Sequence, residues 1–121
     1  MKTFFIAAIS ILFSVAAQFS LKAGMSSEGV KQSLALPFSL RTIFPVMTNV
    51  NILGGFLLYG LGAIVWLGVL SKWDVSKAYP LVGLGFVLTV AIGYLVGEQI
   101  STSRVAGIIL ISIGIFLVGR S

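Results

Sequence analysis

The chain has 121 residues, of which 58% are hydrophobic and 9% charged, with a mean hydropathy of +1.12, so it lacks the polar surface of a soluble enzyme. Cysteine and histidine are absent, which excludes thiol and imidazole chemistry and the usual soft metal ligands, and no cofactor is implied. The net charge of +5 comes from basic residues that stand singly between apolar segments, which favours a membrane protein that handles anionic lipid over a nucleic-acid-binding one.

Four apolar segments approach the length of about 20 residues that a membrane-spanning helix needs. The sequence therefore predicts an all-α integral membrane protein, a single domain in which four transmembrane helices form an antiparallel bundle. Basic residues are balanced, four on each side of the membrane, so the positive-inside rule leaves the topology undetermined. The predicted spans are residues of about 3–22, 50–71, 77–97 and 104–119.

The first segment carries a polar stripe. Ser10, Ser14, Gln18 and Lys22 recur every four residues, which places them along one helical face. Gln18 is the most informative of them, because an amide in hydrocarbon needs a partner or a wet cavity. We expect Ser14, Gln18 and Lys22 to draw an anionic headgroup inward, although snorkelling to the interface explains Lys22 equally well.

A secretory signal peptide is the alternative for the same segment. Lys2, the apolar run 4–13 and the small residues Ala16 and Ala17 match a signal with its cleavage site. The polar stripe and the apolar residues beyond that site favour a retained helix.

The connection of about residues 24–48 mixes charged and large apolar residues. Pro37 and Pro45 are expected to break any long helix there. This pattern predicts an interfacial segment that lies among the lipid headgroups, with a short amphipathic helix as one form of it.

The third segment begins with a cluster that contains Lys77, Tyr79 and Pro80. Lys77 and Tyr79 are candidates to face a cleft and bind substrate, although Tyr79 also suits a simple interfacial anchor. Gly93 and Gly97 further along form a GxxxG pair, a pattern typical of close helix packing.

The fourth segment follows a tight turn. We expect an ion pair between Glu98 and Arg104 to close that turn, and one of the residues 101–103 to cap the helix. Gly107 and Gly114 share one face of the helix and are candidates for a dimer interface, with packing inside the chain as the alternative. A dimer is the expected working unit because four thin apolar helices enclose no polar path alone.

The run from Ser14 through Gln18 to Lys22 resembles the first-helix signature of the subunits that flip 4-amino-4-deoxy-L-arabinose-phosphoundecaprenol. The segments 75–80, 97–107 and 113–114 are similar to the same group and to the wider drug/metabolite transporter superfamily. The resemblance covers about the first 25 and the last 50 residues and leaves out the middle of the chain.

This resemblance implies a subunit of a bacterial inner-membrane flippase that moves a polyprenyl-phosphate-linked sugar. The sugar-phosphate head would pass between the first and third spans, with Lys22 and Lys77 as phosphate sites at opposite ends. Its partners would be the lipid-linked sugar phosphate, membrane lipids, and a second copy or a related four-helix subunit.

Two other functions remain open. One is an exporter of small organic cations or metabolites, because the small multidrug resistance proteins share the four-helix plan. Those exporters need a carboxylate in the middle of the first helix, where this sequence has Ser14. The other is a scaffold subunit of a membrane assembly that transports nothing.

Overall fold

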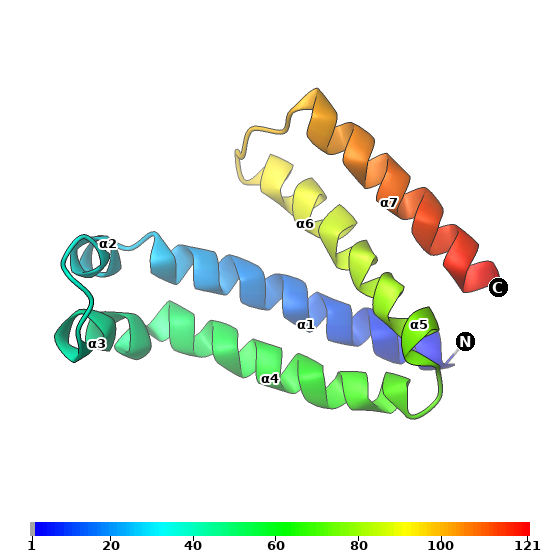
Figure 1. Cartoon of the computed structure of the whole chain (residues 1–121), viewed down its shortest axis with the longest axis horizontal. Coiled ribbons are helices and arrows are strands. Elements are labelled where there is room, and N and C mark those ends of the chain that lie inside the picture. Colours follow the sequence, from blue (N-terminus) through cyan, green and yellow to red (C-terminus); the bar gives the residue numbers. More distant parts are fainter. Residues whose placement is uncertain (1) are drawn as a thin grey trace.

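A computed structural model describes residues 2–121, and its regular elements are all helical in that range. Figure 1 shows them in chain order along the ribbon. The elements are α1 (Lys2–Met25), α2 (Glu28–Leu34), α3 (Leu40–Thr48), α4 (Val50–Leu70), α5 (Val75–Ala78), the 3₁₀ turn η1 (Tyr79–Val82), α6 (Gly83–Leu95) and α7 (Thr102–Arg120).

Four helical runs within residues 2–121 are long and apolar enough to cross a membrane: α1, α4, the continuous run Val75–Leu95 and α7. Their 24, 21, 21 and 19 residues correspond to about 28–36 Å of helix, which matches a hydrocarbon core of about 30 Å. The predicted all-α fold with four membrane-spanning helices is confirmed, and the chain is a multi-pass membrane protein.

The helices α1 and α4 lie side by side and antiparallel along their lengths (Figure 1). Gly62 permits this approach, because a Cβ atom at that position would lie 3.1 Å from the Cβ of Phe13 and 3.2 Å from the carbonyl oxygen of Ser10. The buried Ser10 hydroxyl donates a hydrogen bond of 2.7 Å to the Gly62 carbonyl oxygen. A second bond of 2.6 Å runs from the Ser20 hydroxyl to the Asn51 carbonyl oxygen.

The third span is not one regular α-helix. Four residues, Tyr79–Val82, form a 3₁₀ turn between α5 and α6. Pro80 explains the change, because it has no N–H to donate and its ring clashes with the carbonyl group four residues earlier.

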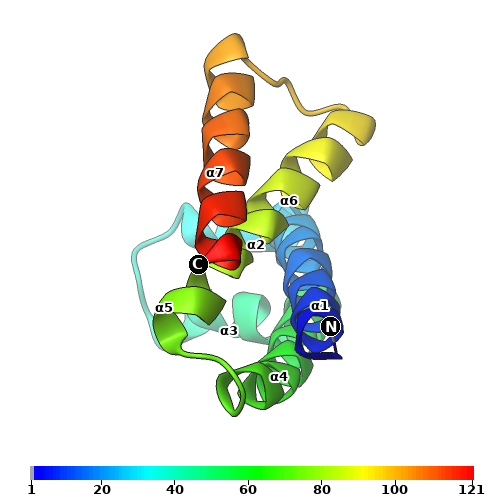
Figure 2. The ribbon, with the colours of Figure 1, turned by 90° about the vertical axis from the view of Figure 1, so that its right-hand side faces the viewer.

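The buried core lies where all four spans meet, at the end that holds both chain termini. From this point the α6–α7 hairpin diverges from the α1–α4 hairpin (Figures 1 and 2). The bundle therefore consists of two hairpins joined at one end. The buried residues of this cluster are Ala7, Ile11, Val15, Val69, Ala78, Leu81 and Ile115.

The connection between the first two spans folds into α2 and α3, at the far end of the α1–α4 hairpin (Figure 1). Ser39 and Thr42 form a capping box at the start of α3. Pro37 separates the two helices, and Pro45 lies inside α3. The helices have only 7 and 9 residues, so no long helix forms in this connection, as expected. Phe38 and Leu40 are 85% and 87% exposed, which leaves large apolar side chains on this segment uncovered.

The helix α6 ends in a Schellman motif. Gly97 has a φ angle of 97°, its N–H bonds the Tyr94 carbonyl oxygen at 3.2 Å, and the N–H of Glu98 bonds the Gly93 carbonyl oxygen at 2.9 Å. Glycine adopts this left-handed conformation without steric cost. Gly97 therefore terminates the helix, and the expectation of a GxxxG packing face with Gly93 was wrong.

The turn before α7 is held by separate contacts of Glu98 and Arg104. The Arg104 guanidinium donates to the Gln99 carbonyl oxygen at 3.1 Å, and the Glu98 carboxylate lies over Gly93. An ion pair between the two is not among the contacts of residues 2–121, and the Arg104 guanidinium is instead used by the Gln99 carbonyl oxygen. The expected cap is confirmed, since the Ser101 hydroxyl accepts the N–H of Arg104 at 3.1 Å.

Candidate functional site

A cavity of about 500 Å³, here called the central cavity, lies between α1, α4 and the η1–α6 segment. Its size falls in the range of small-molecule sites. Most of its wall is aliphatic or aromatic, and the polar groups come from three different spans. The side chains that carry the argument below are Ser14 and Gln18 from α1, Tyr59 and Trp66 from α4, and Phe86 and Thr89 from α6.

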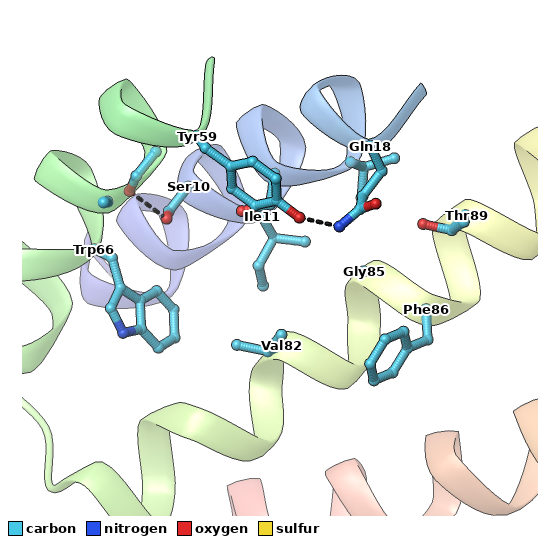
Figure 3. A pocket seen from close by; sticks show the side chains of 13 residues that line it. Ser10, Ile11, Gln18, Tyr59, Trp66, Val82, Gly85, Phe86 and Thr89 are labelled. Carbon is cyan, nitrogen blue, oxygen red and sulfur yellow. Dashed lines mark hydrogen bonds between the residues drawn. The ribbon is translucent and has the colours of Figure 1, made fainter. Parts of the chain in front are cut away.

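Gln18 and Tyr59 meet across α1 and α4 at the wall of this cavity. The Gln18 amide donates a hydrogen bond to the Tyr59 hydroxyl (Figure 3). From the sequence we expected the Gln18 amide to have either a hydrogen-bond partner or a wet cavity. The structure gives it a partner, Tyr59, and places it at a cavity. Tyr59 was missed from the sequence, although it carries the only side-chain hydroxyl among residues 50–70.

The polar stripe of α1 divides between packing and cavity. Ser10 is buried in the seam with α4 at the edge of the central cavity, whereas the half-buried Ser14 and the exposed Gln18 line the cavity further along α1. Lys22, one turn further, is exposed and is not among the lining residues. The structure therefore places two of the three predicted substrate-binding residues of the stripe, Ser14 and Gln18, on one wall, and their role in binding substrate stays a prediction.

Two aromatic rings and a further hydroxyl complete the lining of the central cavity. Trp66 from α4 and Phe86 from α6 project on opposite sides of the cavity, and the Thr89 hydroxyl points into the space in front of Gln18 (Figure 3). The lining residues carry no formal charge. Such a wall suits a sugar ring, whose apolar face stacks on an aromatic ring while its hydroxyls take hydrogen bonds.

Lys77 and Tyr79 do not share a cleft, contrary to the expectation from the sequence. The half-buried Lys77 places its ammonium 4.7 Å from the centre of the Trp73 ring and lines a second cavity at the other end of the third span. Tyr79 is 67% exposed and lines neither cavity. Residues two apart on a helical turn point to different sides, which explains the separation.

Gly107 and Gly114 lie on an uncovered part of α7. A Cβ atom built at either position has no neighbouring atom within 4 Å. Only 6% of the apolar, membrane-crossing stretch of α7 is buried within the chain, against 28% of that stretch in α1. Packing inside the chain therefore does not explain these glycines, and the dimer interface stays a prediction.

Comparisons with known proteins identify relatives along the whole chain. The chain is 32% identical to the probable 4-amino-4-deoxy-L-arabinose-phosphoundecaprenol flippase subunit ArnF of Proteus mirabilis, over 99% of this chain and 94% of the relative. It is 31% identical to the probable subunit ArnE of the same flippase from Erwinia tasmaniensis, over 92% of this chain and 91% of the relative.

Other relatives match a shorter part. The chain is 47% identical to the probable subunit ArnE of Pseudomonas savastanoi pv. phaseolicola over 62 residues, which is 50% of this chain and 54% of the relative. In this and similar Pseudomonas matches, the chain spans about half the length of the relative. No protein-family model and no solved structure matches the chain.

Proposed function

The chain belongs to the family of 4-amino-4-deoxy-L-arabinose-phosphoundecaprenol flippase subunits, and we propose that it is one subunit of a flippase that moves a polyprenyl-phosphate-linked sugar across a bacterial inner membrane. The polyprenyl tail stays in the lipid while the sugar-phosphate head passes along the central cavity. Transport follows the gradient of the lipid-linked sugar or the membrane potential acting on its phosphate charge, with no covalent chemistry assigned to the protein.

The observation that carries the proposal is a set of polar side chains in the middle of four apolar helices. Polar groups at membrane depth are costly unless they are paired or solvated, so they mark a path for a polar solute. Ser14, Gln18 and Thr89 offer hydrogen bonds to sugar hydroxyls, and Trp66 offers a ring face. An amino sugar adds an ammonium group, which aromatic faces attract without any carboxylate.

Phosphate capture is assigned to the two ends of the path. Lys22 lies near the end of α1, and Lys77 lies near the start of the third span, at the opposite end of the α1–α4 hairpin. A cation at each end attracts the phosphate in either leaflet. Lys22→Ala should therefore slow flipping, whereas Lys22→Arg retains part of it because the charge survives. Loss of membrane insertion in the Ala variant would assign Lys22 to snorkelling instead.

The exposed apolar residues of α2 and α3 are proposed to rest among the headgroups, as expected for an interfacial segment. Phe38 and Leu40 would then contact lipid, with Lys31 and Arg41 nearby to meet anionic headgroups. The uncovered face of α7 would contact a second copy or a related four-helix subunit, in keeping with the two subunit names that the relatives carry.

Export of small organic cations is the second candidate, favoured by the aromatic wall of the central cavity. The four spans of residues 2–121 contain no aspartate or glutamate. A proton-coupled exchanger needs such a group to bind either a proton or the cation. We therefore place the lipid-linked sugar first.

The test uses proteoliposomes with the lipid-linked amino sugar in both leaflets and a membrane-impermeant amine reagent outside. Vesicles without protein should expose about half of the sugar amines to the reagent. Vesicles with the chain, alone or co-reconstituted with a four-helix relative, should expose nearly all of them as sugars flip outward. Uptake of a quaternary ammonium compound is measured in parallel, and uptake of that cation without flipping would favour the exporter.

A further inference from the structure

A second cavity of about 520 Å³ lies at the end of the molecule that holds both termini. We call it the terminal cavity. Its wall includes Phe4 from α1, Trp73 and Lys77 from around α5, and Ser112, Phe116 and Arg120 from α7. Figures 1 and 2 both show the C-terminal end of α7 beside α5. The cavity is therefore formed only when the two hairpins meet.

Two cations face this cavity from different elements, and each rests on an aromatic ring. The Lys77 ammonium lies 4.7 Å from the centre of the Trp73 ring, and the Arg120 guanidinium lies 5.8 Å from the centre of the Phe116 ring. A cation on a ring face is held in place while its remaining N–H groups stay free to donate. The Ser112 hydroxyl is already used, because it donates to the Ile108 carbonyl oxygen at 2.8 Å.

The side chains that line the terminal cavity carry positive charge only. No aspartate or glutamate is among its lining residues. The rest of the wall is apolar, with Phe4, Leu81 and Ile115 among its members. Two cations beside an apolar surface fit an anion that carries a hydrocarbon chain, and the position at the end of the spans matches the depth of lipid headgroups.

We propose that the terminal cavity binds the phosphate group of an anionic membrane lipid, with Lys77 and Arg120 on the phosphate and an acyl chain along the apolar wall. Binding there would tie α5 to the end of α7 and so hold the two hairpins together. The proposal shares Lys77 with the phosphate capture of the proposed function, but it concerns a site apart from the central cavity and is tested by binding without transport, so the failure of one is distinguishable from the failure of the other.

The test uses Trp73 as a reporter. The chain has two tryptophans, so Trp66→Phe leaves Trp73 as the single fluorophore. That protein, in neutral detergent, is titrated with phosphatidylglycerol that carries brominated chains, which quench a nearby indole. Quenching should be saturable. In a Lys77→Gln or Arg120→Gln variant the half-saturating concentration should rise about fivefold, and about 25-fold in the double variant.

Matched controls separate this site from general charge attraction. Lys72→Gln removes the same charge five positions earlier, at an exposed residue outside the terminal cavity, and should leave the titration unchanged. Brominated phosphatidylcholine, which has no net charge, should give no saturable quenching. Circular dichroism checks that the variants stay helical, and Arg120→Gln at the end of α7 is the variant that least disturbs the fold.

Three outcomes would overturn the proposal. The double variant could show the same half-saturating lipid concentration as the parent protein, or Lys72→Gln could weaken binding as much as Lys77→Gln does. Inorganic phosphate could also displace the lipid completely when added at the concentration of the lipid. The last result would show a site for the free anion. Undecaprenyl phosphate is added as a competitor, and its displacement of phosphatidylglycerol would support a lipid-phosphate site and extend it to the carrier lipid. The flipping assay is run on Arg120→Gln, because Lys77 is also assigned to phosphate capture in the proposed function. Normal flipping together with weaker lipid binding in this variant would separate the terminal cavity from transport.

Discussion

The hydrogen bond between Gln18 and Tyr59 joins two spans at the wall of the central cavity, so removing it should affect both stability and transport. The perturbations are Gln18→Leu, Tyr59→Phe and the two combined. Hydrogen bonds between membrane helices contribute about 0.6 kcal/mol on average and about 1.7 kcal/mol at most. Each single variant should lower the free energy of unfolding by an amount in this range, and the double variant should cost little more than the worse single one.

Transport should separate the two residues. Gln18→Leu removes the amide that faces the sugar, which costs about 0.5–1.5 kcal/mol and slows flipping by up to about tenfold. Tyr59→Phe keeps the ring and leaves the amide free to bind sugar, so flipping should fall less. Asn51→Leu is the matched control, because it removes an amide from α4 at a residue that does not line the cavity.

Two assays test the pairing of Gln18 with Tyr59 and the role of Gln18 in transport. Unfolding in mixed micelles with increasing dodecyl sulfate, followed by circular dichroism, gives the three free energies and their coupling. The amine-labelling assay in vesicles gives the flipping rates. Strictly additive free energies would refute the pairing, and wild-type flipping in the Gln18→Leu variant would show that the polar stripe of α1 is tolerated polarity without a role in transport.

Three further predictions test other parts of the molecule. Gly62→Ala should lower the free energy of unfolding by about 1 kcal/mol or more, because a Cβ there meets the backbone of α1. Gly60→Ala is the control and should not lower it, because that position has open space around it. Dodecyl sulfate titration measures both variants, and equal effects would contradict the close contact between α1 and α4. Isoleucine at both Gly107 and Gly114 should reduce cross-linked dimers in detergent while monomers still insert, and an unchanged yield would move the interface elsewhere. The flipping rate should be equal with and without a pH gradient at fixed membrane potential, because the spans lack carboxylates. If flipping requires the gradient and Glu98→Gln removes that requirement, Glu98 is the coupling site.

The sequence by itself determined the number and the approximate limits of the spans. Each span depends on a local run of apolar residues long enough to cross hydrocarbon, and such runs are visible without knowledge of neighbours. The cap at Ser101 was also predictable, because capping involves residues three positions apart. The family was predictable for the same reason, since its motifs are short stretches of chain.

Part of the candidate site was predictable as well. The spacing of Ser14 and Gln18 placed them on one face of α1, and both line the central cavity. The partner of Gln18 was not predictable, because Tyr59 lies 41 positions away on another helix. Pairing Lys77 with its neighbour Tyr79 failed for the opposite reason: closeness in sequence does not put two side chains on one side of a turn.

Only the tertiary structure decided how the spans meet. It joined the hairpins at the end with the termini, formed the central cavity along α1 and α6, and brought Lys77 and Arg120 to one terminal cavity. Apart from the polar stripe of α1, the spans are apolar nearly all round, so periodicity leaves their rotation and crossing angles open. Those angles follow from close contacts between helices, such as Gly62 against α1, which no single segment contains.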